Sequence, residues 1–423
     1  MNKIIIIGAG PAGLSAAYHL KSGYELFEKE KEPGGLLRSR NINGFIFDYA
    51  GHIFSTRDMY VTGLINKLLG DNVHFQDRSS WVYSKGKYTP YPFQANTFGL
   101  PVEVVKECLL GAIKAHYENL KYSRPSNFKE WIYARFGEGI ARHFMLPYNS
   151  KLWTVPLEEM GCEWINSRIP EPGIEEVLEG ALSSRPQSHS KFGYPLRGGC
   201  GALPNSFGIS AHLNAKITHI SLSDRTVTVN DKERIGYDRL ISTMPLPEII
   251  RIIDGVPPDV LEVCPRLRFV SLLCVNLGFA RSRISEKHWI YYPEKEFVFH
   301  RNFIQSNISP YLCPEGTSSI TCEISYSPYK RIDKGKIVER VVNDLILANY
   351  IDRNDEILAE DVVDIEYAYI VPDIDYKSKI KKAFDFLESN RIYSAGRFAE
   401  WEYYDTDDAI LSGKRTAEKI NKY

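Results

Sequence analysis

The N-terminal segment constrains the fold of this chain more strongly than any other. Lys3–Ile7 is a short apolar run rich in β-branched residues, which suits a buried parallel strand. A glycine-rich hexapeptide, GAGPAG at positions 8–13, follows at once, and apolar residues then recur at helical spacing over 14–20. A second short strand, Tyr24–Phe27, ends at Glu28. This order of strand, glycine-rich turn, helix and acid-terminated strand predicts a βαβ unit that binds a dinucleotide.

The residues of the turn have distinct predicted roles. Gly8 allows the tight turn, Gly10 lets the backbone approach a pyrophosphate, and Gly13 lets the helix pack closely on the strand. Ala12 lies at the start of the helix, whose free N–H groups and positive dipole end favour phosphate. Glu28 is placed to accept hydrogen bonds from the adenosine ribose hydroxyls. We therefore expect these residues to bind the cofactor.

The composition restricts the broad class of the protein. The 423 residues include 52 Lys and Arg against 53 Asp and Glu, which argues against a nucleic-acid binder that works through a general basic field. No apolar run approaches the roughly 18 residues that a membrane span requires, and we see no signal-peptide pattern. The seven cysteines are scattered without any CxxC pair. We therefore expect no disulfide framework, no metal site and a cytoplasmic location.

A second glycine pair, in Pro33-Gly34-Gly35-Leu36, lies only a few residues after Glu28, so its backbone can wrap the same pyrophosphate. The pattern resembles the large flavoprotein family of amine oxidases, protoporphyrinogen oxidases and UDP-galactopyranose mutases, and this resemblance implies FAD. Many oxidases of that family carry Arg directly after the pair, where this chain has Leu36. We expect Gly35 and Leu36 to contact the cofactor.

The family's last segment returns to the flavin through a strand, a Gly-Arg pair and a helix. Gly396-Arg397 and the helix expected from Asp407 match that layout. A helix N-terminus at the N1/O2 edge of the flavin would stabilise its reduced, anionic form. Asp407 and Asp408 stand where the family has an Asn-Gln pair.

These signals predict an α/β fold in which an FAD-binding domain of Rossmann type is built from both chain ends. A helical domain and an antiparallel β-sheet substrate domain are inserted into it. The predicted bounds are 1–80, 190–260 and 385–423 for the FAD-binding domain, 95–189 for the helical domain, and 81–94 with 261–384 for the sheet domain. We further expect a helix cap at Asn127, irregular structure over 149–190, and a half-buried strand over 320–326, where apolar and polar residues alternate.

Six motifs along nearly the whole chain resemble the UDP-galactopyranose mutase family, and especially its eukaryotic-type branch. They are Ala50-Gly51-His52-Ile53-Phe54, Tyr91-Pro92-Phe93-Gln94, Pro147-Tyr148-Asn149-Ser150-Lys151-Leu152-Trp153, Tyr194-Pro195-x-Arg197-Gly198-Gly199, Trp289-Ile290-Tyr291 and Gly396-Arg397-Phe398-x-x-Trp401-x-Tyr403. The resemblance implies an isomerase of cell-surface polysaccharide synthesis that interconverts UDP-galactopyranose and UDP-galactofuranose, or a close UDP-sugar. It also implies that N5 of the reduced flavin attacks the sugar to form an adduct, that UDP leaves, and that NADPH or NADH is the reductant.

The same resemblance assigns the site residues. His52, after Gly51, should lie against the flavin, and His52, Arg168 and Arg301 form the catalytic set around flavin N5. The uracil pocket would comprise Tyr91, Phe93, Gln94, Asn149, Trp153 and Tyr291, and Trp289 would also bind the substrate. Arg168, Arg301, Tyr376 and Tyr403 would hold the diphosphate, with the motif register loosest at Tyr376, because arginine forks suit phosphate.

Each assignment has a structural alternative. The aromatic residues could pack a helix junction, the arginines could form surface ion pairs, and His52 could be satisfied inside its glycine-rich turn. Two departures from the family leave the sugar open. Ile308 replaces a phosphate-binding tyrosine, whose bond is then absent or supplied by Tyr311, and His189 replaces an Asn near the sugar.

Two other functional classes stay open. The first is an FAD-dependent amine oxidase or protoporphyrinogen oxidase-like oxidoreductase. The second is a non-catalytic protein that senses FAD or a nucleotide. The sequence leaves the formation of homo-oligomers undecided.

Overall fold

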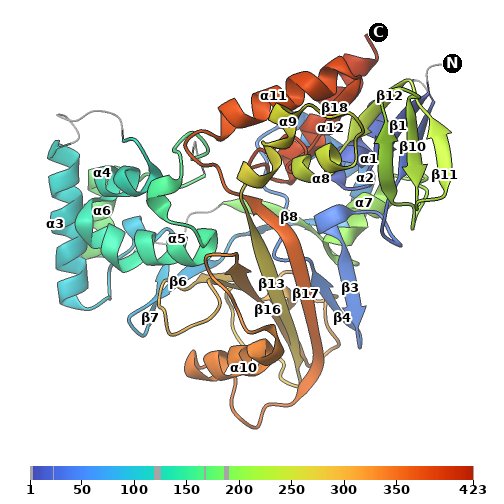
Figure 1. The fold of residues 1–423 in the computed structure, drawn as a ribbon. Coiled ribbons are helices and arrows are strands. Elements are labelled where there is room, and N and C mark those ends of the chain that lie inside the picture. Colours follow the sequence, from blue (N-terminus) through green and yellow to red (C-terminus); the bar gives the residue numbers. More distant parts are fainter. Residues whose placement is uncertain (1–2, 22, 119–124, 166–167, 185–189, 423) are drawn as a thin grey trace.

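The two ends of the chain meet in one parallel sheet (Figure 1). The computed structural model describes residues 3–21, 23–118, 125–165, 168–184 and 190–422. The sheet has the order β18-β12-β1-β2, formed by Ile392–Ser394, Arg239–Ser242, Ile4–Ile7 and Tyr24–Phe27. The four isoleucines of β1 are buried, as a central parallel strand requires. This arrangement confirms the predicted α/β fold with a βαβ unit at its start.

Helices from opposite ends of the sequence pack together beside this sheet. They are α1 (Pro11–His19) and α12 (Thr406–Ile420). A Cβ added at Gly413 of α12 would come within 2.1 Å of the Ala12 carbonyl oxygen of α1. The absence of a side chain at Gly413 therefore permits the C-terminal helix to approach the glycine-rich turn.

A seven-stranded sheet forms a second body, with the order β17-β13-β16-β15-β14-β6-β7. In chain order its strands are β6 Ser80–Ser84, β7 Lys87–Pro90, β13 Phe269–Phe279, β14 Trp289–Tyr291, β15 Arg301–Phe303, β16 Ser318–Tyr326 and β17 Ile357–Ile370. Neighbouring strands are antiparallel except β14 and β6, which are parallel. Helix α10 (Ile337–Leu347) packs on one face of this sheet (Figure 1).

Strand β16 differs from its sequence prediction. Its polar residues were expected to face solvent, but both faces are buried, and Thr321 and Glu323 are 0% exposed. The apolar face, with Ile320 and Ile324, packs in the same cluster as α10. The polar face is covered by the turn at Gly51, whose N–H donates to Glu323 Oε1 at 3.1 Å. The alternation of apolar and polar residues along β16 therefore separates an apolar buried face from a polar buried face.

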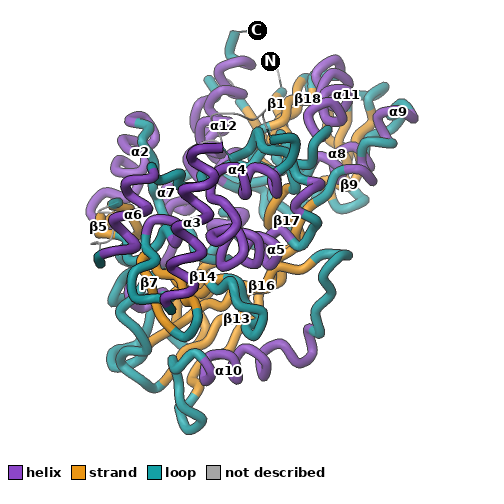
Figure 2. Tube along the Cα trace, turned by 90° about the vertical axis from the view of Figure 1, so that its left-hand side faces the viewer, coloured by secondary structure: helices purple, strands orange, loops and turns teal. Residues whose placement is uncertain are grey.

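Among the described residues, four α-helices lie between β7 and residue 190 (Figure 2). They are α3 Val102–Glu118, α4 Phe128–Ile140, α5 Leu146–Trp153 and α6 Ile174–Leu182. The predicted cap is confirmed, because the Asn127 side chain accepts from the Glu130 N–H at 3.0 Å. The prediction of irregular structure over 149–190 is wrong where α5 and α6 form. Helix α6 begins where the Glu176 carboxylate accepts from the Gly173 N–H at 2.9 Å, and it buries Val177.

The remaining described elements are small or lie against the parallel sheet. They are α2 Met59–Leu69, β3 Ser39–Ile42 with β4 Phe45–Asp48, β5 Val73–Asp77 with β8 Lys191–Pro195, the three-stranded sheet of β9 Ile217–Ser221, β10 Thr226–Val229 and β11 Glu233–Gly236, and the helices α7 Ala202–Ser206, α8 Leu246–Arg251, α9 Pro258–Leu261 and α11 Tyr376–Ser389.

The predicted domain boundary between 384 and 385 falls inside α11. Ile380 and Leu387 of this helix pack in one cluster with Ile5 of the parallel sheet. Among the described helices, none is long and apolar enough to cross a bilayer.

Candidate functional site

Two glycine-rich segments touch at the head of the parallel sheet. The Gly34 N–H donates to the Ala9 carbonyl oxygen at 2.8 Å. A Cβ added at Gly35 would lie 3.1 Å from the Gly10 Cα atom. A Cβ added at Gly13 would lie only 1.9 Å from the Gly8 carbonyl oxygen, which no side chain permits. The backbone of both segments is therefore uncovered by side chains at these glycines. We call the surface formed by Gly10, Gly34 and Gly35 the glycine cradle, and it fits a pyrophosphate bound by backbone N–H groups.

Glu28 supports this cradle directly. Its carboxylate accepts from the Ala9 N–H at 2.7 Å and from the Glu30 N–H at 3.0 Å, and the residue is buried. The side chain thus fixes the first turn. Its predicted bond to a ribose remains a prediction.

The C-terminal segment closes the same region. Gly396 has φ of +93°, and a Cβ there would meet the Ala12 Cβ at 2.7 Å. The Arg397 guanidinium is held in place by donating to the carbonyl oxygens of Tyr404, at 2.6 Å, and Ala368, at 3.0 Å. Asp408 caps the start of α12, and burial raises the pKa of Asp407 although Thr56 donates a hydrogen bond to it.

His52 follows the bare turn at Gly51. Its Nδ1 atom is buried without a hydrogen bond of ordinary geometry in the described part of the chain, although the Ala50 backbone lies near. Burial, with the charges of Arg397 and Arg301, lowers the pKa of His52 to about 4. The imidazole is therefore neutral at pH 7. A buried ring nitrogen that lacks a hydrogen bond of ordinary geometry fits a flavin bound against this turn.

The low pKa of His52 makes stability depend on pH. Below the ordinary pKa of 6.5 the unfolded chain binds a proton that the folded state rejects, so stability is lost as pH falls toward 4. At about pH 4.5 this term amounts to about 2.5 kcal/mol. We expect His52→Gln to reduce the loss of unfolding free energy between neutral pH and about pH 4.5 by that amount, measured by urea denaturation. An unchanged loss in the variant would show that His52 titrates normally.

Arg301 and the His52 turn share one buried carboxylate. The Arg301 guanidinium donates to Glu323 from Nε at 3.0 Å and from Nη2 at 2.7 and 3.0 Å. Glu323 also accepts from the Gly51 N–H. Although burial opposes it, the charge of Glu323 raises the pKa of Arg301 well above its ordinary value. Arg301 is thus a permanently charged donor, one-fifth exposed, whose position is tied to that of the turn.

An aromatic pair lies beside Arg301. Tyr291 is its cross-strand neighbour on β14, and the Tyr91 ring stacks on Tyr291 with centroids 4.8 Å apart. Arg78 donates to the Tyr291 hydroxyl at 2.9 Å, and its guanidinium also lies 5.4 Å from the Trp289 ring centroid. Flat aromatic surface bordered by donors is suited to a planar, polar ring.

Tyr403 lies between Arg397 and two residues of the helical part of the chain. Its ring lies 4.8 Å from the Arg168 guanidinium carbon and 5.3 Å from that of Arg397. It also stacks on Tyr369 at 6.1 Å and lies 5.6 Å from the Trp153 ring. Burial raises the pKa of Tyr403, and the nearby cations, Arg397, Arg168 and Arg301 among them, act in the opposite direction. Three arginines therefore influence one phenol.

Arg168 forms the ion pair that was its structural alternative. It donates to Asp405 at 2.6 Å and to Asp408 at 3.1 Å, both at the start of α12. These bonds hold Arg168 over the Tyr403 ring, and they also balance its charge. A phosphate ligand would have to share Arg168 with these carboxylates.

Three residues of the predicted uracil pocket make contacts within the protein. Phe93 stacks on Phe144 in the core, and the amides of Gln94 and Asn149 donate to the Pro170 and Met145 carbonyls at 2.8 and 2.7 Å. These amide bonds hold backbone segments. Their predicted roles in a uracil pocket remain predictions.

Tyr376 is not brought to the arginines. It is buried in the cluster of α11, and its hydroxyl donates to Glu402 at 3.2 Å. Ile308 is buried, whereas Tyr311 is 47% exposed with the Arg197 guanidinium over its ring. His189 lies outside the described residues.

Sequence reasoning missed three members of the site, Tyr369, Glu323 and Arg78. Tyr369 and Glu323 lie on long strands of the sheet domain, and only the register of those strands brings them to Arg301. The alternation of β16 marked Glu323 as a residue of the polar face but predicted that it faces solvent. No cluster of metal-ligating side chains occurs among the described residues.

The sequence matches a known family over nearly its whole length. Residues 11–421 match the flavin containing amine oxidoreductases. The chain therefore belongs to this family, and its membership supports FAD as the cofactor.

The similar proteins include a UDP-galactopyranose mutase and two protoporphyrinogen oxidases. A crystal structure of reduced UDP-galactopyranose mutase superposes with a TM-score of 0.94 and 30% identity, over 99% of this chain and 94% of that one. Protoporphyrinogen oxidase 2 of Arabidopsis thaliana, chloroplastic/mitochondrial, is 21% identical over 350 residues, 70% of this chain and 68% of the relative. Mitochondrial protoporphyrinogen oxidase of Nicotiana tabacum is 23% identical over 353 residues, 70% and 69% of the two chains.

Proposed function

We propose that this protein is a flavin-dependent mutase that interconverts UDP-galactopyranose and UDP-galactofuranose, or a close UDP-sugar. The observation that carries the proposal is the grouping of Arg301, Tyr369 and Tyr403 beside the turn that bears His52. The similarity to a reduced UDP-galactopyranose mutase across the whole chain supports the same conclusion.

Different residues of the site would bind the diphosphate and the uracil of the substrate. Arg301, with Arg168 and Tyr403, would bind the diphosphate and restrain UDP after its bond to the sugar breaks. The stacked Tyr91 and Tyr291 would provide the flat surface for uracil.

The cofactor would lie in the glycine cradle, between Gly10 and the start of α12. When bound and reduced, FAD would supply the nucleophile for the anomeric carbon, so no side chain needs to do so. The neutral His52 can orient the ring by a hydrogen bond from or to Nδ1, and at pH 7 it lacks the second proton that an imidazolium would donate as an acid. We propose NADPH or NADH as the source of electrons.

Two tyrosines offer a matched test of the phosphate site. Tyr369 lies near Arg301 and stacks on Tyr403, whereas Tyr376 bonds to Glu402. We expect Tyr369→Phe to raise KM for the UDP-sugar about tenfold, through loss of one hydrogen bond to a charged group. Tyr376→Phe should leave KM within about twofold. The opposite order in steady-state kinetics would make Tyr376 the phosphate ligand.

An oxidoreductase of the same family is the second candidate, favoured by the oxidases among the sequence relatives. Such an enzyme would pass electrons from substrate to flavin in every turnover. The charged and hydrogen-bonding lining of this site, with Arg301 and Arg168, suits an anionic substrate better than an apolar one.

A product screen tests the proposal. The purified protein is reduced anaerobically with dithionite and incubated with UDP-hexoses and UDP-pentoses, and the products are separated by chromatography. The proposal predicts a furanose product from UDP-galactopyranose or a close relative. No isomerisation of any UDP-sugar by protein with stable reduced flavin would refute it.

A further inference from the structure

A pocket lies beside α5 and is lined by residues that have no role in the site described above. Its volume is about 710 Å³, within the range of roughly 300–1,000 Å³ that is usual for small-molecule sites. It is lined by Tyr133, Glu138, Arg142, Leu146, Pro147, Ser150, Lys151, Lys295 and Lys330. Asn149 and Trp153 of the same helix are buried, whereas the pocket takes the exposed Ser150 and the adjacent Lys151. The two sites thus share a helix but use different residues of it.

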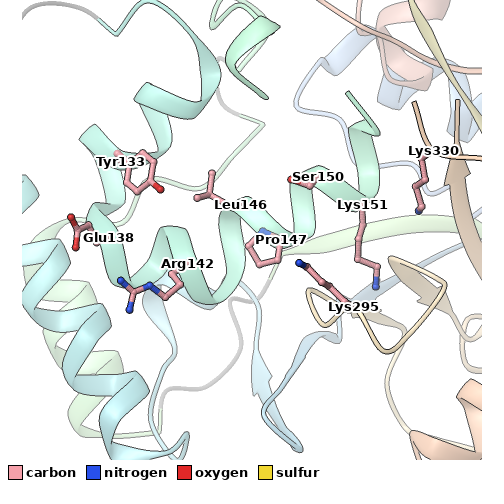
Figure 3. A pocket seen from close by; sticks show the side chains of 9 residues that line it. All are labelled: Tyr133, Glu138, Arg142, Leu146, Pro147, Ser150, Lys151, Lys295 and Lys330. Atoms are coloured by element: carbon pink, nitrogen blue, oxygen red, sulfur yellow. The ribbon is translucent and has the colours of Figure 1, made fainter. Parts of the chain in front are cut away.

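The lining carries four cationic side chains against one carboxylate. Lys151, Lys295 and Lys330 stand at one end of the pocket, and Arg142 and Glu138 stand at the other (Figure 3). Arg142 already donates to Glu107 at 3.1 Å outside the lining. The uncompensated charge therefore belongs to the end with three lysines.

Two of these lysines are held away from water. The Lys151 Nζ donates to the carbonyl oxygens of Tyr292 and Glu294, both at 2.9 Å. The Lys330 Nζ is buried and has no hydrogen-bond acceptor in the described part of the chain. A buried ammonium group without an acceptor is costly, and an anion in the pocket would satisfy it if the flexible Lys330 side chain turned toward the anion.

The electrostatics of the lysines agree with this reading. Burial lowers the pKa of Lys330 to about 8. Burial, and then the charge of Lys330, lowers the pKa of Lys151 to about 7, although the carboxylates of Glu294, Asp344 and Glu296 oppose the shift. Burial is thus the main cause of both lowered pKa values, and a bound anion would act in the opposite direction.

We propose that this pocket is a binding site for an oligophosphate anion, separate from the candidate flavin and UDP-sugar site. A protonated lysine presents a compact point charge with three donors. Three lysines around one pocket suit several phosphate groups in a chain, and a bound anion would favour the protonated form of Lys151. The pocket is larger than one phosphate needs. Tyr133, Leu146 and Pro147 add an apolar wall that could accept the base of a nucleotide.

Calorimetric titration of the FAD-loaded protein tests the site with two probes, sodium triphosphate and magnesium-free adenosine triphosphate. We expect one equivalent of each to bind per chain. Tighter binding of the nucleotide would assign the apolar wall to its base, and equal affinity would assign recognition to the phosphates alone. Absence of binding by both probes up to about 10 mM, a free energy weaker than about −3 kcal/mol, would overturn the proposal.

Variants locate the binding. Lys295→Gln changes an exposed residue and should fold, and Lys330→Gln removes the buried charge. Each should weaken triphosphate binding about tenfold, the effect of losing one charge-assisted hydrogen bond. Lys422→Gln, in a separate basic patch with Arg415 and Lys419, is the matched control and should bind as the wild type does.

The double variant Arg301→Met with Glu323→Gln, which removes both charges of one buried ion pair, separates this pocket from the proposed substrate site. It should retain triphosphate binding. Loss of binding in a folded double variant, or full binding in both lysine variants, would place the anion elsewhere and contradict the proposal, whatever the outcome of the UDP-sugar assay.

Discussion

Arg301→Ala is expected to lower kcat/KM for the UDP-sugar by at least about 100-fold while the protein keeps its flavin. The Arg301 guanidinium is a charged hydrogen-bond donor of the kind that binds a departing diphosphate. Losing two hydrogen bonds to phosphate costs about 1.5–3 kcal/mol each. Steady-state kinetics on reduced enzyme give the rate, and the flavin absorbance gives cofactor content. Arg283→Ala, which removes an exposed arginine paired with Glu286, is the matched control and should be neutral.

This substitution also leaves Glu323 buried without its cation. Removing one partner of a buried ion pair typically costs about 3–5 kcal/mol of stability, so a loss of activity could reflect unfolding. The double variant Arg301→Met with Glu323→Gln removes both charges and should recover most of that stability. We expect it to remain inactive. A stable, fully active double variant would show that Arg301 does not hold the substrate.

Gly10→Ala is expected to yield folded protein without flavin. Gly10 has extended backbone with φ of −75°, and an added Cβ would meet only the Gly35 Cα, at 3.7 Å. The protein itself therefore tolerates the methyl group. A pyrophosphate against the Gly10 backbone does not, because the methyl group occupies the line of approach.

The matched control is Gly23→Ala, where an added Cβ would have no neighbour within 4 Å. Flavin content per chain is read from the visible spectrum, and folding from circular dichroism. Gly10→Ala protein that purifies with a full complement of flavin would place the cofactor elsewhere. Gly23→Ala should match the wild type in both measurements.

Local signals in the sequence predicted the βαβ unit and one helix cap correctly. The GAGPAG turn and the cap at Asn127 depend on residues that are close in sequence, so their structures follow from short-range sterics and hydrogen bonds. Gly396 lies against Ala12 of α1, so the C-terminal segment does return to the glycine-rich turn.

Long-range contacts were harder to predict because they depend on strand register. Glu323 meets Arg301 through the pairing of β15 with β16, and its alternation with apolar residues predicted solvent exposure instead. Asp405 reaches Arg168 from 237 positions away, so the ion pair could not be read from either segment. Tyr376 was assigned by motif register, and in the structure Tyr369 occupies the place beside Tyr403.

The most direct test of the proposed function counts electrons against product. Anaerobic protein is reduced once with one equivalent of dithionite, given a large excess of UDP-galactopyranose, and followed by the flavin spectrum together with chromatography of the products. The mutase predicts many molecules of furanose per flavin while the flavin stays reduced. One oxidation or reduction event per product, or no furanose from protein that retains its reduced flavin, would contradict it.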